Sequence, residues 1–322
     1  MKKLLKWTGI ILGSLVLGVV IVVWLMQYKT FDAAYPDIRA STDSSIVARG
    51  KYLVMGPAHC TACHFNPDSM AFYNDTGKVI LSGGTKFVLP IGTIQSPNLT
   101  SDKETGIGNL SDMQIARALR YGVGHDGRAL FDFMPFQNLS DDDLTALISF
   151  LRTLPPVKNK VTVRNLNLLG YGVKAFLIKP VGPSAVPAKS VKADTTAEYG
   201  EYIANNVSNC RGCHTNRDLM TGAYTGKFYA GGFHMEGATD PEHYECVTPN
   251  LTPDPKTGHI YGWSEDVFLQ RLHAGRRIEQ SAMAWEQFSR LKDNDIKAIY
   301  KYLQTLAPVE NNTGPILVKI EK

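Results

Sequence analysis

The sequence has little net charge and no concentration of positive charge. Lysine and arginine total 34 against 30 acidic residues, which leaves +4 at neutral pH, and part of this excess is Lys2, Lys3 and Lys6 at the N-terminus. A nucleic-acid-binding surface normally shows a basic stripe with interleaved aromatic residues. No such stripe is present, so nucleic acid is excluded as an expected partner. The 322 residues suffice for two domains with buried cores.

Charged residues are absent from residues 7–28. This run, WTGIILGSLVLGVVIVVWLMQY, is long enough to cross the ~30 Å hydrocarbon core of a bilayer as a helix. Trp7 near one end and Trp24 with Tyr28 at the other match aromatic belts, and the preceding lysines favour a cytoplasmic N-terminus. We therefore expect a transmembrane anchor, with the rest of the chain outside. A cleaved signal peptide is the alternative, although its apolar region is normally only about 7–15 residues long.

Cysteine is scarce, and its spacing is not that of a disulfide framework. Four of the five cysteines form two Cys-x-x-Cys-His motifs, at 60–64 and 210–214, and the fifth, Cys246, has no counterpart. We expect Cys246 to be a buried thiol. The motifs lie in a duplicated module. The matches, at offsets of about 150 positions, are Gly50/Gly200, Tyr52/Tyr202, Gly83-Gly84/Gly231-Gly232, Pro97-Asn98-Leu99-Thr100/Pro249-Asn250-Leu251-Thr252, and LRTLPPV (151–157)/LQTLAPV (303–309).

Each module has the same predicted helical plan. A first helix approaches the motif, a middle helix begins at Ser111 or Ser264, and a last helix follows Ser140 or its counterpart, with apolar residues on one face. Between them lie loops rich in Gly, Pro and Asn, with no convincing strand pattern, so we predict an all-α fold. The predicted divisions are a cytoplasmic tail (1–6), the anchor (7–28), a tether (29–43), a first domain (44–158), a linker (159–194) whose first half packs and whose second half is flexible, and a second domain (195–322).

The Cys-x-x-Cys-His pattern is the attachment signature of c-type haem. Two thiols three residues apart reach one edge of a flat ring, and the histidine that follows lies below the iron. We therefore predict two covalently bound haems c. The attachment residues are Cys60, Cys63 and His64 in the first module and Cys210, Cys213 and His214 in the second. A shared zinc site, a redox dithiol and a short-loop disulfide are the alternatives. The separation of the two pairs in copied modules, and the lack of a thioredoxin-like context, argue against them.

A second protein ligand would turn each iron into an electron-transfer site, and methionine raises its potential. Met134, in the loop FDFMPF before the last helix, is our candidate in the first module, and Met283, in SAMAW, occupies the same interval in the second. Met283 lies three residues farther from its last helix and lacks the proline that follows Met134. The competing residues are Met55, Met70 and Met113 in the first module and Met220, Met235 and His234 in the second.

The combined motifs resemble those of dihaem and trihaem cytochromes c. The relevant segments are RGKYLV…HCTACH, SGG, SPNLTSDKETGIGNLSD, MPF and SDDDLTALISFLRTLPPV, with their second copies, and the resemblance covers nearly all of residues 46–309. The sequence is most similar to the cytochrome subunits of bacterial membrane-bound alcohol and gluconate dehydrogenases. This resemblance implies two tandem class I cytochrome c domains with the ligand pairs His64/Met134 and His214/Met283. Here two motifs are present, where the trihaem subunits have three.

The resemblance also implies a function in electron transfer. We expect a single-pass protein of the bacterial inner membrane with its haem domains in the periplasm. It would pass electrons between a periplasmic dehydrogenase or quinone-linked donor and a terminal acceptor such as an oxidase, with no catalytic activity of its own beyond electron transfer. Such redox encounters use small, transient interfaces. The alternative from another class is a dihaem enzyme, a peroxidase or a thiosulfate dehydrogenase, which would need an open or unusual iron ligand.

Overall fold

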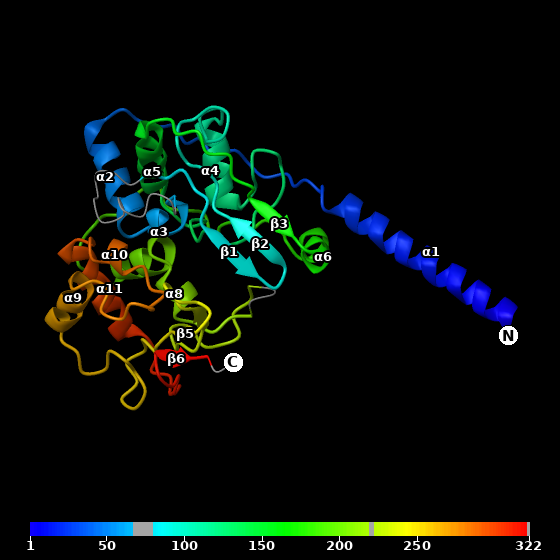
Figure 1. Ribbon diagram of the computed structural model, residues 1–322. Coiled ribbons are helices and arrows are strands. Elements are labelled where there is room, and N and C mark those ends of the chain that lie inside the picture. Colours follow the sequence, from blue (N-terminus) through cyan, green and yellow to red (C-terminus); the bar gives the residue numbers. More distant parts are fainter. Residues whose placement is uncertain (67–79, 219–221, 321–322) are drawn as a thin grey trace.

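The computed structural model of the chain describes residues 1–66, 80–218 and 222–320. Most of the regular secondary structure of these residues is helical, and the helices of the two modules lie side by side (Figure 1). The first repeat contains α2 (Ser44–Met55), α3 (Cys60–His64), α4 (Asp112–Tyr121) and α5 (Asp141–Thr153). The second contains α7 (Ala197–Tyr202), the π-helix η2 (Ile203–Val207), α8 (Cys210–Cys213), α9 (Glu265–His273), α10 (Trp285–Phe288) and α11 (Asp293–Thr305).

The middle and last helices begin where the sequence predicts. Ser111 and Gln114 form the expected capping box at the start of α4, in which each side chain accepts a hydrogen bond from the backbone of the other residue. Ser140 caps α5 and Ser264 caps α9. The predicted apolar face of α5 is buried, and so is most of the matching face of α11. Those buried residues are Leu144, Leu147, Ile148 and Leu151 in α5, and Ile296, Ile299 and Leu303 in α11.

In each repeat the first helix crosses the last helix at a glycine. A Cβ atom on Gly50 of α2 would lie 1.8 Å from the carbonyl oxygen of Ala146 in α5. A Cβ atom on Gly200 of α7 would lie 1.9 Å from the carbonyl oxygen of Ala298 in α11. Only glycine permits this close approach of two helix backbones. The repeated glycine therefore sets the separation between the helix that precedes each Cys-x-x-Cys-His motif and the last helix of the same repeat.

Two three-stranded antiparallel sheets depart from the predicted all-α class. In each sheet a hairpin pairs with a third strand that follows the last helix of the same repeat. The strands are three or four residues long, too short for a two-residue hydrophobic alternation to be recognised in the sequence. The strands are β1 (Lys86–Leu89), β2 (Gly92–Gln95) and β3 (Arg164–Leu166) in one sheet, and β4 (His234–Glu236), β5 (Tyr244–Val247) and β6 (Leu317–Lys319) in the other.

Both Pro-Asn-Leu-Thr segments tie a loop to the end of the last helix. The Asn98 side chain donates a hydrogen bond of 2.8 Å to the carbonyl oxygen of Val157, and the Asn250 side chain donates one of 2.8 Å to that of Val309. A nearby ion pair is also present in both repeats, but the lysine and the glutamate have exchanged positions. It joins Lys158 to Glu104 in the first repeat and Lys256 to Glu310 in the second. The duplication seen in the sequence is thus a duplication of structure.

The apolar N-terminal run forms a single helix, α1 (Lys2–Met26), with no buried residue. By length and composition it is the one helix in the described part of the chain that could cross a membrane. The segment that follows, predicted to be a tether, lies against the first repeat. Ile38 is buried, the Ala40 amide donates a hydrogen bond to Asp112, and the Ser41 amide donates one to Ser149. The end of α1 is therefore held close to the first repeat.

The connection between the repeats contains one further helix, α6 (Leu168–Phe176). Its Val173 packs in a small second core with Ile91, Ile94 and Leu166, as the apolar composition predicts. The second half of the connection, predicted to be flexible, makes backbone hydrogen bonds to the start of α5: the amides of Asp141 and Asp142 donate to the carbonyl oxygens of residues 188 and 189. This part of the connection lies along the first repeat.

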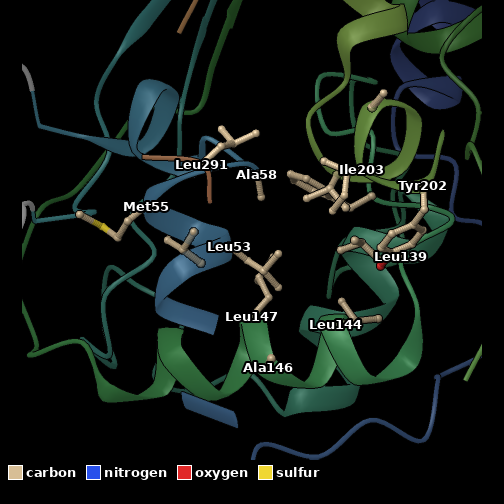
Figure 2. Packing of buried hydrophobic residues seen from close by; sticks show 14 of the residues in the cluster. Leu53, Met55, Ala58, Leu139, Leu144, Ala146, Leu147, Tyr202, Ile203 and Leu291 are labelled. Atoms are coloured by element: carbon tan, nitrogen blue, oxygen red, sulfur yellow. The ribbon is translucent and has the colours of Figure 1, made fainter. Parts of the chain in front are cut away.

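The two repeats share one continuous core. Figure 2 shows Tyr202 and Ile203 of the second repeat against Leu139 of the first, and Leu291 close to Ala58. Leu139 and Ile203 have no exposed surface. Because these contacts are apolar and fully buried, the repeats are fixed relative to each other rather than joined by a loose linker.

Candidate cofactor-binding site

The two Cys-x-x-Cys-His motifs have the same local backbone. The residue before the first cysteine, His59 in one motif and Asn209 in the other, has a left-handed conformation with φ of 40° and 54°. A short helix, α3 or α8, begins at the cysteine that follows. A non-glycine residue in this region is strained, and such strain concentrates at functional sites. The preceding helix in the second repeat ends in the π-helix η2, which is another feature common at functional sites.

Each motif histidine is oriented by the repeated proline segment. The Nδ1 atom of His64 lies 2.9 Å from the carbonyl oxygen of Pro97, and Nδ1 of His214 lies 3.0 Å from that of Pro249. A carbonyl oxygen only accepts, so Nδ1 carries the proton and the lone pair is on Nε2. Neither Nε2 has a hydrogen-bond partner in the described part of the chain. A metal-binding histidine is typically held in this way.

Burial keeps both imidazoles neutral. It lowers the pKa of His64, and it lowers the pKa of His214 to about 4, in each case against the opposing effect of the proline carbonyl. Neutral imidazole is the form that binds a metal ion. The two histidines therefore present unprotonated Nε2 atoms over the whole range near neutral pH.

The four motif cysteines form no disulfide. Burial raises the pKa of Cys60 to about 12 and that of Cys210 to about 12. The pKa of Cys63 rises to about 11, chiefly through burial. Thiols with such high pKa values are poor nucleophiles and poor thiolate ligands at neutral pH. Each repeat thus offers two cysteines that form no disulfide and one oriented imidazole, which fits a group that takes the thiols in covalent bonds and binds the imidazole through a metal.

Met134 and Met283 both lie in loops between the middle and last helices of their repeats, and both are partly buried against the shared core. The carbonyl oxygen of Met134 accepts a hydrogen bond of 2.9 Å from the Gln137 side chain. The carbonyl oxygen of Met283 accepts one of 2.8 Å from the Trp285 amide. The backbone of each loop is therefore anchored at the methionine itself. A sixth ligand would lie across the iron from the histidine and would not contact it, so the role of Met134 and Met283 as ligands stays a prediction.

The other candidates for the second iron ligand lie outside the loops that carry Met134 and Met283. Met55 is buried at the end of α2, and Met113 lies in α4, with its sulfur 4.0 Å from the Arg39 guanidinium. Met235 is in β4 opposite Cys246, and His234 makes an exposed ion pair of 2.9 Å with Glu245. Met70 and Met220 lie outside the described residues.

The longer interval that follows Met283 contains the short helix α10, which covers the motif of the first repeat. Gln287 donates a hydrogen bond of 3.0 Å to Thr61, inside the Cys-x-x-Cys-His segment. The Phe288 ring meets the His59 ring edge-on, with centroids 5.4 Å apart. Arg290 donates a hydrogen bond to the Met55 carbonyl oxygen. The interval after Met283 that looked irregular in the sequence thus contains the residues that contact the first repeat.

Two tyrosine–aspartate pairs cross between the repeats. Tyr202 donates a hydrogen bond of 2.8 Å to Asp143 at the start of α5, and the equivalent Tyr52 hydrogen-bonds to Asp295 at the start of α11. Each hydroxyl also accepts a bond from a backbone amide, that of Ser140 or Lys292. The arrangement is repeated at equivalent positions, so the repeats are related by an approximate two-fold relationship at this contact.

The packing brings the two motifs next to each other. Cys213 lies near enough to Cys63 to raise its pKa further. Burial raises the pKa values of Cys213 and of Asp132 in the Met134 loop, and Arg217, which follows the second motif, partly offsets both increases. The Nε atom of Arg217 is buried without a hydrogen-bond partner in the described residues. An acidic group bound between the motifs would satisfy it, which further fits a cofactor that carries carboxylates.

The contacts between the repeats were not predicted. Tyr52 and Tyr202 were visible as repeated residues, and Asp143 and Asp295 stand at matching positions of the last helices. The repetition of these residues could have identified them as candidates for a shared contact. Nothing in the sequence shows, however, that each tyrosine donates a hydrogen bond to the aspartate of the other repeat.

Relatives with known names resemble this chain over most of its length, although no family model matches it. The gluconate 2-dehydrogenase cytochrome c subunit of Pantoea cypripedii is 30% identical over 293 residues, covering 85% of this chain and 62% of the relative. The cytochrome c subunit of a quinone alcohol dehydrogenase of Gluconobacter oxydans is 30% identical over 300 residues, covering 87% and 58%. This chain thus spans about three fifths of the length of these relatives.

A third relative matches in length as well. The diheme c-type cytochrome of Cereibacter sphaeroides is 25% identical over 264 residues, which cover 78% of this chain and 83% of the relative. The likeness to proteins of this kind agrees with the two repeated Cys-x-x-Cys-His sites and their oriented histidines. The chain is a homologue of the cytochrome c subunits of alcohol and gluconate dehydrogenases and of a dihaem cytochrome c.

Proposed function

We propose that this protein is a membrane-anchored dihaem cytochrome c that transfers electrons. One haem c would be attached through Cys60 and Cys63, and the other through Cys210 and Cys213. The proposed ligand pairs are His64/Met134 and His214/Met283, in two class I cytochrome c domains formed by residues 44–158 and 195–322. The observation that supports this most strongly is the repeated bond from the motif histidine to the proline carbonyl, which leaves Nε2 free for iron in both repeats.

A haem bound at each site would supply a one-electron iron couple. The protein residues would determine how it is held. Each thiol would add its sulfur and hydrogen across a vinyl group, forming a thioether with no leaving group. The proline carbonyl fixes the imidazole plane and its tautomer. The loops that carry Met134 and Met283 are pinned at their own carbonyl oxygens, so that a sulfur ligand would be presented with little cost in conformational freedom.

The adjacency of the motifs supports electron transfer between two sites within one chain. Cys213 lies close enough to Cys63 to contribute to its raised pKa, and the crossed tyrosine–aspartate pairs hold the repeats in one arrangement. A fixed separation is what a tunnelling route needs, because motion of one site relative to the other would change its length. The electrons would therefore pass from one repeat to the other without dissociation of a partner.

The N-terminal helix supports a membrane location. We propose that α1 spans the bacterial inner membrane once, with Lys2, Lys3 and Lys6 on the cytoplasmic side and the repeats in the periplasm. Removal as a signal sequence is the alternative for α1. The names of the relatives favour a dehydrogenase of small alcohols or sugar acids as the electron donor. Quinone or a terminal oxidase would be the acceptor.

The far-red charge-transfer band of oxidised His/Met haem tests the proposal. We expect the purified full-length protein to show this band at the strength of two haems, and cyanide or peroxide to change it little. Rapid reduction of both haems by a small reductant, with no peroxide turnover, would support a carrier. A band of half that strength together with peroxide consumption would instead support a dihaem enzyme.

A further inference from the structure

Helix α6 exposes a large apolar surface on the first repeat. Leu168 is 82% exposed and Leu169 is 52% exposed, and Phe176 and Leu177 at the other end of the helix are also about half exposed. The opposite side of α6 is closely packed: a Cβ atom on Gly170 would lie 2.0 Å from the carbonyl oxygen of Ile91. The helix is therefore held rigidly, with leucine and phenylalanine facing outward. Such a face usually has a partner.

The position of α6 relative to α1 indicates what that partner is. The helix packs against the C-terminal end of α1 (Figure 1), and the ammonium group of Lys174 lies 5.9 Å from the ring centroid of Tyr28. Trp24 and Tyr28 at this end of α1 are the residues expected at a membrane–water interface. Because α6 is attached to this end of α1, it would lie at the membrane–water interface and contact the lipid surface.

A small pocket lies between the end of α1 and α6. It is lined by Met26, Lys29, Phe31, Arg128, Lys174 and Ile178. Its walls thus combine apolar side chains from the end of the candidate membrane span with three cations. Such a mixture matches the boundary between phospholipid headgroups and acyl chains.

The charge around this pocket is strongly positive. Arg164 and Arg128 act on Lys174, and together with burial they lower its pKa to about 8. Arg128 is paired with Asp126, whereas Lys29, Arg164 and Lys174 have no ion pair in the described residues. Lys29, Arg128 and Lys174 thus line the pocket. Arg164 is a further cation close to Lys174. Arg164 and Lys174 are partly buried, and unpaired cations in such positions are costly to hold together unless an anion joins them.

We propose that α6 and this pocket form a binding site for anionic phospholipid, with the exposed face of α6 lying in the membrane interface. Lys29 and Lys174 of the pocket, with Arg164 beside Lys174, would hold the headgroup phosphate. This inference rests on the proposed membrane span of α1. Its consequence is that the first repeat is seated on the bilayer in a fixed orientation, rather than swinging on a tether. The docked segment 29–43 supports the same arrangement.

Native mass spectrometry of the full-length protein released from lipid nanodiscs tests the headgroup site. We expect the protein to retain phosphatidylglycerol in preference to phosphatidylcholine. The double variant Arg164→Gln/Lys174→Gln should lose about fivefold in retention for each charge removed. The control Lys51→Gln/Lys103→Gln, which removes two exposed lysines of the first repeat, should retain lipid like the unaltered protein. Equal retention by both double variants, or binding of inorganic phosphate alone, would overturn the proposal.

Photo-crosslinking tests the apolar face separately. A benzophenone amino acid in place of Leu168 should form lipid adducts in phosphatidylethanolamine–phosphatidylglycerol vesicles, whereas one in place of Tyr261, exposed on the second repeat, should form none. A third probe at Leu17 in α1 reports the span itself. Adducts at position 17 without adducts at position 168 would overturn the seating of α6 while leaving the span intact. Absence of adducts at both positions would remove the membrane location as well.

Discussion

Tyr202 in the second repeat and Asp143 in the first are joined by a 2.8 Å hydrogen bond that has an equivalent between Tyr52 and Asp295. Each aspartate also binds a residue of its own repeat, Arg49 in one case and Tyr199 in the other. The same carboxylate position thus receives a charged partner in the first repeat and a neutral one in the second. The two halves of this contact have diverged chemically while keeping their geometry.

The crossed pairs should contribute measurably to stability. Because Tyr202 and Asp143 are both buried, Tyr202→Phe should lower the free energy of unfolding by about 1–3 kcal/mol. The measurement is urea unfolding of the haem-loaded protein, with Tyr171→Phe as the control, because Tyr171 is exposed. Equal unfolding midpoints for the two variants would contradict a role for the pair. Tyr202→Phe should also slow electron exchange between the haems if the pair fixes their separation.

The glycine crossings should not tolerate a side chain. Gly50→Ala and Gly200→Ala would each place a methyl group within 2 Å of a helix carbonyl oxygen, so we expect a loss of about 3 kcal/mol or more. Gly172→Ala in α6 is the matched control, because a Cβ atom there meets nothing within 4 Å and alanine favours the helix. Thermal unfolding compares the three. If the Gly50→Ala and Gly172→Ala proteins unfold at the same temperature, α2 and α5 do not cross as closely as described.

The proposed sulfur ligands can be separated by substitution. Met134→Ala should remove about half of the far-red charge-transfer band and make one haem reactive toward cyanide, with a lower potential for that haem. Met283→Ala should remove the other half. Met113→Ala and Met235→Ala are the controls in the two repeats and should leave the spectrum unchanged. A full-strength band in Met283→Ala would show that another residue ligates the second iron.

The second repeat should lose some stability as the pH rises. His273 bonds the Ser289 carbonyl oxygen through Nδ1 and Asp293 through Nε2, and these contacts raise its pKa above 6.5 in the folded protein. A raised pKa gives stability that is fully present below pH 6.5 and is lost as the pH passes through the folded value. His273→Gln should therefore flatten this part of the curve of stability against pH. Identical slopes for the variant and the unaltered protein would refute the linkage.

The elements that could be predicted are those specified by neighbouring residues. The capping box at Ser111, the caps at Ser140 and Ser264, and the buried face of α5 all depend on contacts within a few positions, so their signals are visible in the sequence. The attachment motifs are equally local. The orientation of His64 by Pro97, 33 positions away, depends on a loop path that spacing does not encode, although the repeated proline segment marked it.

The features that were missed depend on contacts between distant segments. The strands are short and pair across the whole repeat, as in β2 with β3. Helix α10 lies where the sequence showed only an irregular interval after Met283. Its role is visible only in the folded protein, where Gln287 donates a hydrogen bond to Thr61 of the first repeat. The second half of the connection has the composition of a flexible linker, yet it bonds to α5, because backbone hydrogen bonds leave no trace in composition.

The intact mass of the purified chain is the most direct test of the proposed cofactor. We expect the mass of the polypeptide plus two haems, and loss of one haem in each of the variants Cys60→Ser/Cys63→Ser and Cys210→Ser/Cys213→Ser. A chain that carries no added tetrapyrrole mass, while remaining folded and matured by a host competent for c-type cytochromes, would contradict the proposal that these four thiols bind haem.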